Sequence, residues 1–222
     1  MTAVKFRRIA LASALAIAPS MRLIDDHPEK NIIRAQLRQN TVLKHMTDDE
    51  LAALGPHLYV MDCAKGDCLL RQGDVEMSQY FLLDGILKRV VANPQGREMI
   101  LQFTDAGGME TSYAAWRLKT RAPYSIATVT KARVAKLPLP EWAAFMEKHV
   151  HIKGVFEYEV MLHMSEIMAH TITLHLLAAP GRVHRFMRKH PELADRVPRK
   201  ELAAYLNLSA ETLSRLRQQG KI

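Results

Sequence analysis

The hydrophobic positions of the chain follow different patterns along its length, and the central pattern is typical of β-strands. From about residue 57 to residue 137, short runs rich in Val, Ile, Leu and Phe alternate with turn signals. These turn signals are Lys65-Gly66-Asp67, Gln72-Gly73-Asp74, Asp84-Gly85, Asn93-Pro94-Gln95-Gly96 and Ala106-Gly107-Gly108. Several short strands at this spacing predict a small antiparallel barrel or sandwich.

Helical patterns precede the strands. Residues 22–45 are expected to be mostly helical. The run Thr47-Asp48-Asp49-Glu50 has the signature of a capping box, in which the Thr and Glu side chains each accept a hydrogen bond from the other residue's backbone amide. It predicts a short helix that ends at Gly55-Pro56.

A helix from Glu141 and then a long helix from about Ile152 to Ala178 are expected after the strands. The long helix carries a seam that steps by three and four residues, while two further faces are also apolar. A helix that is apolar nearly all round is buried on more than one side. We interpret it as packed between its own barrel and a second copy, which predicts a homodimer; the alternative is a core helix in a monomer. The expected interface residues are Phe156, Val160, His163, Ile167, His170 and Leu174.

The segment 199–216 has the pattern of two helices joined by a tight turn. Ala203 is small enough for two helices to cross closely, Asn207 tolerates a positive φ, and Ser209 is a good N-cap for the second helix. The exposed face of that helix is expected to carry Ala210, Glu211, Ser214 and Arg215, where a recognition helix contacts base edges. An ordinary helical hairpin is the alternative.

The charge of the chain is concentrated at its C-terminal end. The net charge is +8, and residues 181–222 contribute +6 of it. A basic end on a nearly neutral body favours a polyanionic partner, most often nucleic acid, although a solvated surface would carry the same charge. The two cysteines, Cys63 and Cys68, are too few for a disulfide framework, so we expect a reducing, cytoplasmic compartment.

The first residues have some features of a secretory signal. Lys5, Arg7 and Arg8 precede an apolar run over residues 9–18, which is too short to span a bilayer. A misread start upstream of Met21, or a disordered extension, is the alternative that we favour, because a C-terminal part that reads DNA is not expected in a secreted protein.

From about residue 45 the chain resembles the Crp/Fnr family of bacterial regulators. The resemblance implies a β-roll sensor, a long dimer helix and a winged helix-turn-helix. Glu211, Ser214 and Arg215 resemble the recognition signature of the Fnr-like branch, which reads TTGAT-type half-sites. The residues that carry the match are Gly66-Asp67, Gln72-Gly73-Asp74, Tyr80-Phe81-Leu82-Leu83-Asp84-Gly85, Gly96-Arg97-Glu98, Gly107-Gly108, Gly181-Arg182-Val183, Glu201-Leu202-Ala203 and Ser209 to Arg215.

The chain departs from the cyclic-nucleotide binders of that family at the expected effector pocket. Their Gly-Glu-Leu-type turn is here Gly108-Met109-Glu110-Thr111, and Tyr124-Ser125 stands where an arginine and a hydroxyl residue are expected. A buried phosphate without a guanidinium is poorly compensated, so we do not expect cyclic AMP as the effector. Ile167 and Met168 stand in for the polar helix residues that meet the purine. The expected pocket residues are Gly108, Glu110, Thr111, Tyr124, Ser125, Ile167 and Met168.

Two further departures from the family concern its iron-sulfur cluster and the β-wing of its DNA-binding domain. The iron-sulfur branch needs four cysteines and this chain has two. The sequence ends at Ile222, shortly after the recognition helix, so we expect the β-wing to be missing or truncated.

The cysteines and four histidines of the chain are weaker signals that also have simpler interpretations. Cys63 and Cys68 flank a predicted turn and could form a redox switch, but such cysteines are more often small apolar strand residues. His149, His151, His163 and His170 could serve haem or a metal, although interface histidines are the commoner outcome, so no cofactor is expected. No catalytic constellation, P-loop or dinucleotide fingerprint is present, so an enzyme is not expected.

The sequence therefore predicts an α+β protein that regulates transcription. We expect an extension over residues 1–20, an antiparallel β-roll of cupin-like jelly-roll type with flanking helices over 21–150, a dimerisation helix over 151–179 and a helix-turn-helix with a truncated wing over 180–222. The expected partners are double-stranded DNA with an inverted-repeat operator, a second copy of the chain, an unidentified small-molecule effector and, for an activator, RNA polymerase; no membrane is expected. The alternative is an effector-binding roll whose tail binds a protein. The expected DNA contacts are Ser209, Ala210, Glu211, Thr212, Ser214 and Arg215 on the second helix, with Arg199, Lys200 and Arg217 on phosphates.

Overall fold

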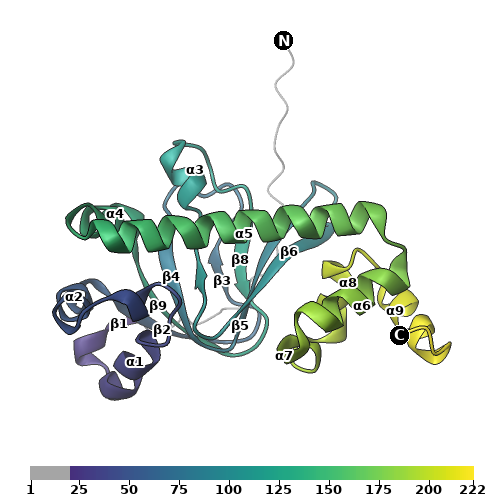
Figure 1. Cartoon of the computed structure of the whole chain (residues 1–222), viewed down its shortest axis with the longest axis horizontal. Coiled ribbons are helices and arrows are strands. Elements are labelled where there is room, and N and C mark those ends of the chain that lie inside the picture. The colour runs from purple at the N-terminus through teal and green to yellow at the C-terminus, as the bar shows by residue number, and fades with distance from the viewer. Residues whose placement is uncertain (1–20) are drawn as a thin grey trace, which may run out of the picture.

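The computed structural model describes residues 21–222, so the expected N-terminal extension over residues 1–20 lies outside the described residues. Two antiparallel sheets face each other and form a roll, the long helix α5 (Val150–Leu176) runs along it, and a group of short helices lies at the far end of α5 (Figure 1). No helix within residues 21–222 is both long and apolar enough to cross a membrane.

The roll is built from a five-stranded and a four-stranded sheet. The first sheet has the order β1-β2-β9-β4-β7 and the second has the order β3-β8-β5-β6, with every neighbouring pair antiparallel. This confirms the predicted antiparallel β-roll. The strands are β1 (Met21–Leu23), β2 (Tyr59–Cys63), β3 (Cys68–Leu70), β4 (Ser78–Asp84), β5 (Ile86–Ala92), β6 (Glu98–Asp105), β7 (Met109–Glu110), β8 (Ser125–Thr128) and β9 (Ala132–Pro138).

The turn glycines of the sequence motifs lie where the backbone needs them. Gly85, between β4 and β5, has a φ of 91°, and a Cβ at this position would lie 2.3 Å from the carbonyl oxygen of Lys131. Any larger residue would therefore both strain the backbone and clash with the neighbouring strand connection. This accounts for the Asp84-Gly85 signal in the sequence.

The N-terminal region is less helical than predicted. Residues 21–23 form β1, which pairs with β2, and only α1 (Lys30–Leu37) is a regular helix in the span 22–45. The helix ends because Asn40 organises the following loop: its side-chain oxygen accepts from the Val42 amide at 3.0 Å, and its amide nitrogen donates to the Gly108 carbonyl at 2.8 Å. A side chain that bonds local backbone in this way competes with helix continuation.

The remaining helices follow the expected order. The capping box at Thr47 is present, with Thr47 and Glu50 exchanging bonds at the start of α2 (Asp48–Leu54). A short helix, α3 (Tyr113–Arg117), interrupts the strands and was not expected. The others are α4 (Leu139–Lys148), α6 (Ala179–Lys189), α7 (Pro191–Ala194), α8 (Arg199–Tyr205) and α9 (Ala210–Gln218), with short 3-10 turns at Ile24–Asp26, Leu43–His45 and Gly55–His57.

The apolar core has two parts. One fills the roll and includes Phe81, Trp142 and Phe156. The other joins the outer face of β6 to the C-terminal helices, with Phe103 of the roll 5.2 Å from the ring of Tyr205 and 6.4 Å from that of Phe186. The C-terminal helices therefore pack on the roll of their own chain through a shared apolar cluster.

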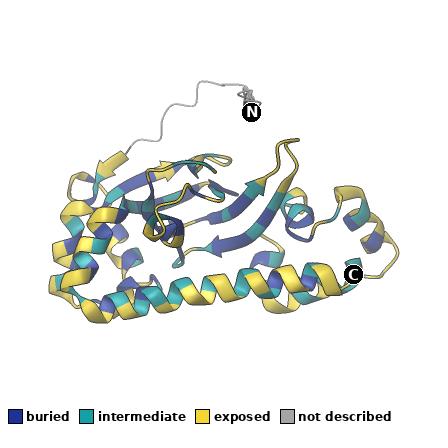
Figure 2. Cartoon of the chain, turned by 90° about the horizontal axis from the view of Figure 1, so that it is seen from above, coloured by how far each residue is buried: buried dark blue, intermediate teal, exposed yellow. Residues whose placement is uncertain are grey.

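The exposed side of α5 forms a nearly continuous strip along the molecule (Figure 2). The strip faces away from the roll, and its large apolar side chains are Tyr158, Met161, Leu162, Met164, Met168, Ile172 and Leu176. Apolar surface of this extent is unusual in a chain without a partner.

Candidate nucleic-acid interface and effector site

The helix-turn-helix has the local geometry that its sequence predicts. Asn207 lies in the turn between α8 and α9 with a φ of 51°. The Ser209 side chain accepts from the Thr212 amide at 3.1 Å and so caps the N-terminus of α9. Ala203 is buried between the helices, and its carbonyl accepts from the Leu208 amide at 2.9 Å, which closes the turn.

One face of α9 is open to solvent. Leu213 and Leu216 are buried against the rest of the helical group, whereas Ala210, Glu211, Ser214 and Arg215 are exposed and Thr212 is half-buried. These five residues and Gln218 line a shallow groove along the helix. Hydrogen bonding to its own backbone amide is the main reason that the pKa of Glu211 is lowered, so this side chain is an anion at neutral pH.

Basic residues lie beside this face. Arg199, at the start of α8, and Arg217, near the end of α9, line a groove together with Ala210 and Ser214. Lys200 follows Arg199, and all three basic residues are exposed. Side chains of this kind at the edge of a recognition helix suit phosphate contacts. The residues expected for DNA contact on α8 and α9 therefore lie at the surface around one helix.

The roll contains a buried ion pair that the sequence analysis missed. Arg89, on β5, donates to the Glu110 carboxylate at 2.6 and 3.0 Å, and the Thr104 hydroxyl donates to the other carboxylate oxygen at 2.6 Å. Glu110 is fully buried and Arg89 is 4% exposed. The sequence contains a signal for a buried arginine here. Side chains alternate along a strand, so Lys88 and Arg89 must point to opposite sides of β5.

Tyr124 completes this cluster. The Arg89 guanidinium lies over its ring, 4.4 Å from the centroid, and its hydroxyl donates to the Thr111 carbonyl at 2.7 Å. Burial raises the pKa of Tyr124, so the phenol stays neutral. Ser125 instead accepts from the Gln72 amide at 2.9 Å.

The premise that the pocket lacks a guanidinium is therefore wrong, because Arg89 supplies one from another strand. That guanidinium is already paired with Glu110 and packed on Tyr124. A cyclic phosphate would have to compete with a buried carboxylate for it. Gly108, Glu110, Thr111 and Tyr124 thus lie together as expected, but around an internal ion pair.

The two α5 residues expected at this pocket lie elsewhere. Met168 is 61% exposed, on the side of the helix that faces away from the roll. Ile167 lines a hollow near Phe103 and Leu193. His163 is the α5 side chain whose electrostatic environment includes Arg89 and Glu110, and burial lowers its pKa.

The expected dimer seam on α5 faces the interior of its own chain. Phe156 is fully buried against Tyr113 and Trp142, and His170 is 9% exposed and stacks on Tyr205 at 3.8 Å. These two residues cannot contact a partner in this arrangement, so their assignment to the interface is wrong. Val160, His163, Ile167 and Leu174 are half-buried on the same side.

Cys63 and Cys68 do not face each other across a hairpin, which is the arrangement that a redox switch would need. Cys63 ends β2 and pairs with Ala132, whereas Cys68 begins β3, which belongs to the other sheet, and pairs with Ala127. Both are free thiols. Burial raises the pKa of Cys63 to about 11 and also raises that of Cys68, so neither is an activated thiolate.

Two histidines at the start of α5 contact a carboxylate. His149 Nδ1 lies 2.9 Å and His151 Nε2 lies 3.4 Å from Glu50 Oε1, which ties α2 to the α4–α5 junction. Within residues 21–222, no group of three or more His, Cys, Asp or Glu side chains is arranged to hold a metal ion.

Comparison with known proteins identifies the roll. Residues 60–149 match the family model of the cyclic nucleotide-binding domain. The matched residues run from β2 to the end of α4. The chain is also homologous to the nitrogen fixation regulation protein FixK of Bradyrhizobium diazoefficiens, with 25% identity over 68% of this chain and 67% of FixK.

Solved structures share this fold over most of the chain. The c-di-GMP-responsive global regulator CLP of Xanthomonas campestris matches with a TM-score of 0.65 and 15% identity over 78% of this chain and 89% of CLP. FixK2 of Bradyrhizobium japonicum matches with a TM-score of 0.61 and 17% identity over 72% and 85%. The catabolite activator protein of Thermus thermophilus matches with a TM-score of 0.52 and 17% identity over 82% and 88%.

These likenesses confirm the predicted fold and the resemblance to Crp/Fnr-type regulators.

Proposed function

We propose that this chain is a homodimeric, sequence-specific DNA-binding regulator of transcription. The observation that carries the proposal is α9, a helix capped by Ser209 whose exposed face presents Glu211, Ser214 and Arg215 to solvent. Homology to a regulation protein supports the same conclusion. Arg215 can bond guanine O6 and N7 through its fork, Glu211 can accept from a cytosine or adenine amino group, and Ser214 can contact a base or a thymine methyl.

The dimer brings two such helices to one DNA duplex. The exposed apolar strip on α5 is the surface that we assign to the second copy, because Tyr158, Met161, Ser165, Met168 and Ile172 step by three and four residues as in a coiled coil. Twofold symmetry then predicts an inverted-repeat operator with half-sites about one helical turn apart. Arg199, Lys200 and Arg217 fix the register on the phosphates.

The roll responds to a small molecule other than cyclic AMP. The Arg89 guanidinium lies over Tyr124, the position at which the family's arginine is expected, and it is already paired with Glu110. An effector must either break this pair or bind beside it. As a regulator of bacterial type, the protein acts in the cytoplasm, with RNA polymerase as a further partner if it activates.

Fluorescence anisotropy with a selected operator tests the proposal. The full chain is titrated into labelled inverted-repeat DNA, into the same DNA with one half-site scrambled, and into unrelated DNA, each at two salt concentrations. We expect tighter binding to the inverted repeat and weaker binding to all three at high salt. Equal affinity for all three sequences, or no binding, contradicts sequence-specific recognition.

A groove in the helical group favours a second candidate, in which the C-terminal helices bind a protein. The groove runs beside α6, α7 and α9, and Val183, Met187 and Leu213 contribute to its apolar lining. Apolar clefts with a polar rim are typical of protein interaction sites. A chain that fails the anisotropy test and retains a defined partner through Met187 would support this second candidate.

A further inference from the structure

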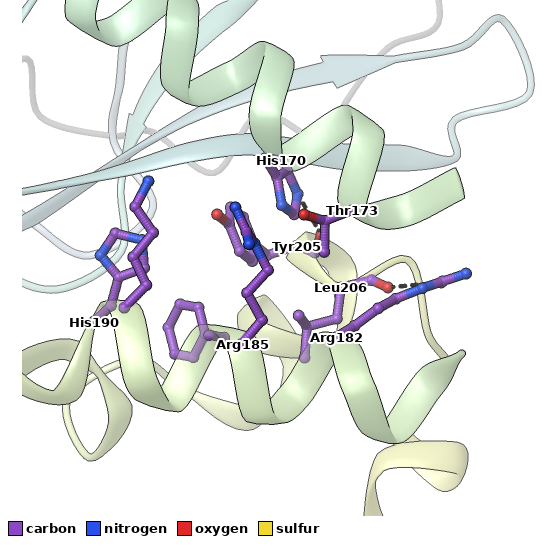
Figure 3. Close-up of a pocket in the computed structure, with 9 residues that line it drawn as sticks. His170, Thr173, Arg182, Arg185, His190, Tyr205 and Leu206 are labelled. Atoms are coloured by element: carbon purple, nitrogen blue, oxygen red, sulfur yellow. Dashed lines mark hydrogen bonds between the residues drawn. The ribbon is translucent and has the colours of Figure 1, made fainter. Parts of the chain in front are cut away.

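A cationic hollow lies where α5 meets the helix-turn-helix. It is bounded by the C-terminal part of α5, the inner face of α6 and the end of α8, and it measures about 310 Å³ including its open mouth (Figure 3). His170 and Thr173 reach it from α5, and Tyr205 reaches it from α8. It is separate from the Arg89–Glu110 cluster inside the roll.

Cationic side chains converge on this hollow from α6. Arg182, Arg185 and Lys189 follow one another at helical spacing and line it. His190, directly after α6, also lines it, and burial lowers the pKa of its imidazole. No carboxylate is among its lining residues. The nearest compensation is Glu166, which pairs with Lys189 at 3.1 Å, and Glu192, which lies 3.8 Å from His190.

Arg185 is the least compensated of these groups. Arg182 donates to the carbonyls of Leu177 and Leu206 at 2.8 and 3.1 Å, so its fork is used within the chain. Arg185 is half-buried, and within residues 21–222 its guanidinium makes neither an ion pair nor a hydrogen bond. In Figure 3 it extends past Tyr205 toward His170. A partly desolvated guanidinium without a partner is unfavourable unless an anion joins it.

His170 lies beside these cations as a neutral imidazole. Its Nε2 lies 3.0 Å from the Tyr205 carbonyl oxygen, so this nitrogen carries a proton and donates. Burial, with a further contribution from Lys189, His190 and Arg185, lowers the pKa of His170 to about 4. The imidazole is therefore neutral, and the surrounding cations disfavour adding a further positive charge.

We propose that this hollow binds a phosphate group of a small ligand, held by Arg185 and Lys189 with His190 at its edge. A tetrahedral oxyanion presents several acceptor oxygens, which suits a guanidinium fork and an ammonium group that approach from different turns of one helix. Because α5, α6 and α8 all border the site, the bound anion joins the long helix to the helix-turn-helix and holds α8 in its position on the roll.

Titration calorimetry on the full chain tests this site without DNA, so its outcome is independent of the proposed DNA recognition. Inorganic phosphate and, separately, adenosine monophosphate are titrated into the protein in chloride buffer of low ionic strength at neutral pH. We expect saturable binding at one site per chain. Equal affinities assign the site to the free anion, whereas tighter binding of the nucleotide assigns it to a phosphomonoester.

Three variants locate the site. Arg185→Gln should weaken phosphate binding by about tenfold or more, as expected for the loss of a charged hydrogen bond. Arg188→Gln is the matched control, because it removes the same charge from an exposed position on α6 outside the hollow, and it should change the affinity less than twofold. Glu166→Gln should strengthen binding several-fold by releasing Lys189 from its ion pair, a direction that general misfolding does not produce.

The absence of saturable phosphate binding to the unaltered chain would overturn the proposal. Equal weakening by Arg185→Gln and Arg188→Gln would also overturn it, because the effect would then follow net charge and not this hollow. If circular dichroism shows that Arg185→Gln is unfolded, Glu166→Gln decides: unchanged or weaker binding contradicts the site.

Discussion

The polar groups inside the roll have hydrogen-bond partners within the chain, whereas those on the exposed face of α9 face solvent. In the roll, Arg89, Glu110 and Thr104 bond one another in the buried interior. On α9, Glu211, Ser214 and Arg215 point into solvent. The roll residues therefore already contribute to the stability of the chain, whereas the α9 residues are available to an external partner.

This difference predicts how each region responds to mutation. Removing one member of a buried pair leaves an uncompensated charge in a medium of low polarity, which lowers the free energy of unfolding. Removing an exposed side chain leaves nothing unpaired in the chain, so the effect should be on binding.

The largest expected effect is that of Glu110→Ala. It leaves the Arg89 guanidinium buried without its carboxylate and should lower the free energy of unfolding by about 3–5 kcal/mol. Urea denaturation monitored by circular dichroism measures this. Glu211→Ala, the same substitution on the exposed face of α9, is the control and should leave the denaturation midpoint nearly unchanged. Similar midpoints for the two variants would contradict the comparison.

The next largest effect concerns α5, where a charge on the exposed side and a charge on the half-buried side should have different consequences. Ile172→Glu places a charge on the exposed apolar strip and should weaken the proposed dimer by at least about 2 kcal/mol while leaving the chain folded. Ile167→Glu, on the half-buried side, should instead lower the stability of each chain. Analytical ultracentrifugation measures the first effect and thermal denaturation the second. A dimer that withstands Ile172→Glu means that the copies associate through another surface.

A smaller effect distinguishes base reading from phosphate contact. Arg215→Ala should cost about 1–3 kcal/mol for each half-site and relax the preference at one base pair. Lys200→Ala should weaken binding to every sequence alike and reduce the salt slope by about one unit per contact. Anisotropy on a set of single-base operator variants at two salt concentrations measures both. If Arg215→Ala kept its affinity and base preference, α9 would not be the reading element.

The smallest expected effect is that of cyclic AMP on the roll. Because Arg89 is occupied by Glu110, we expect no binding at physiological concentrations of the nucleotide. Calorimetry on the unaltered chain checks this, and micromolar affinity would show that the ion pair opens. The variant Glu110→Gln makes this test more sensitive. It keeps the shape of the side chain and removes the charge that pairs with Arg89, so a gain in affinity for the cyclic phosphate should appear first in this variant.

Local signals predicted the helix-turn-helix in detail. Asn207, Ser209 and Ala203 each act through their own backbone or their immediate neighbours, so residue type alone identifies the turn, the cap and the close crossing. The same holds for the capping box at Thr47 and for the turn glycine at Gly85. The span 22–45 was predicted less well, because β1 exists only through its pairing with β2.

Long-range contacts produced the errors in the predicted sites. The guanidinium of the roll was sought at position 124, and strand pairing brings it from position 89 on β5, beside Tyr124. Strand pairing sets this neighbour, and no local pattern encodes it. The sequence also left a redox switch open for Cys63 and Cys68, and only the sheet order shows that the two residues belong to different sheets.

The sequence by itself determined the roll, the long helix and the reading helix, because strand alternation, helical period and capping chemistry act over a few residues. Only the tertiary structure decided which side of α5 is covered. The helix is apolar on both sides with the same period, so Phe156 and Met161 look alike in the sequence. Packing against Trp142 and Tyr113 buries Phe156, and the rotation of α5 that this contact sets leaves Met161 and Ile172 exposed.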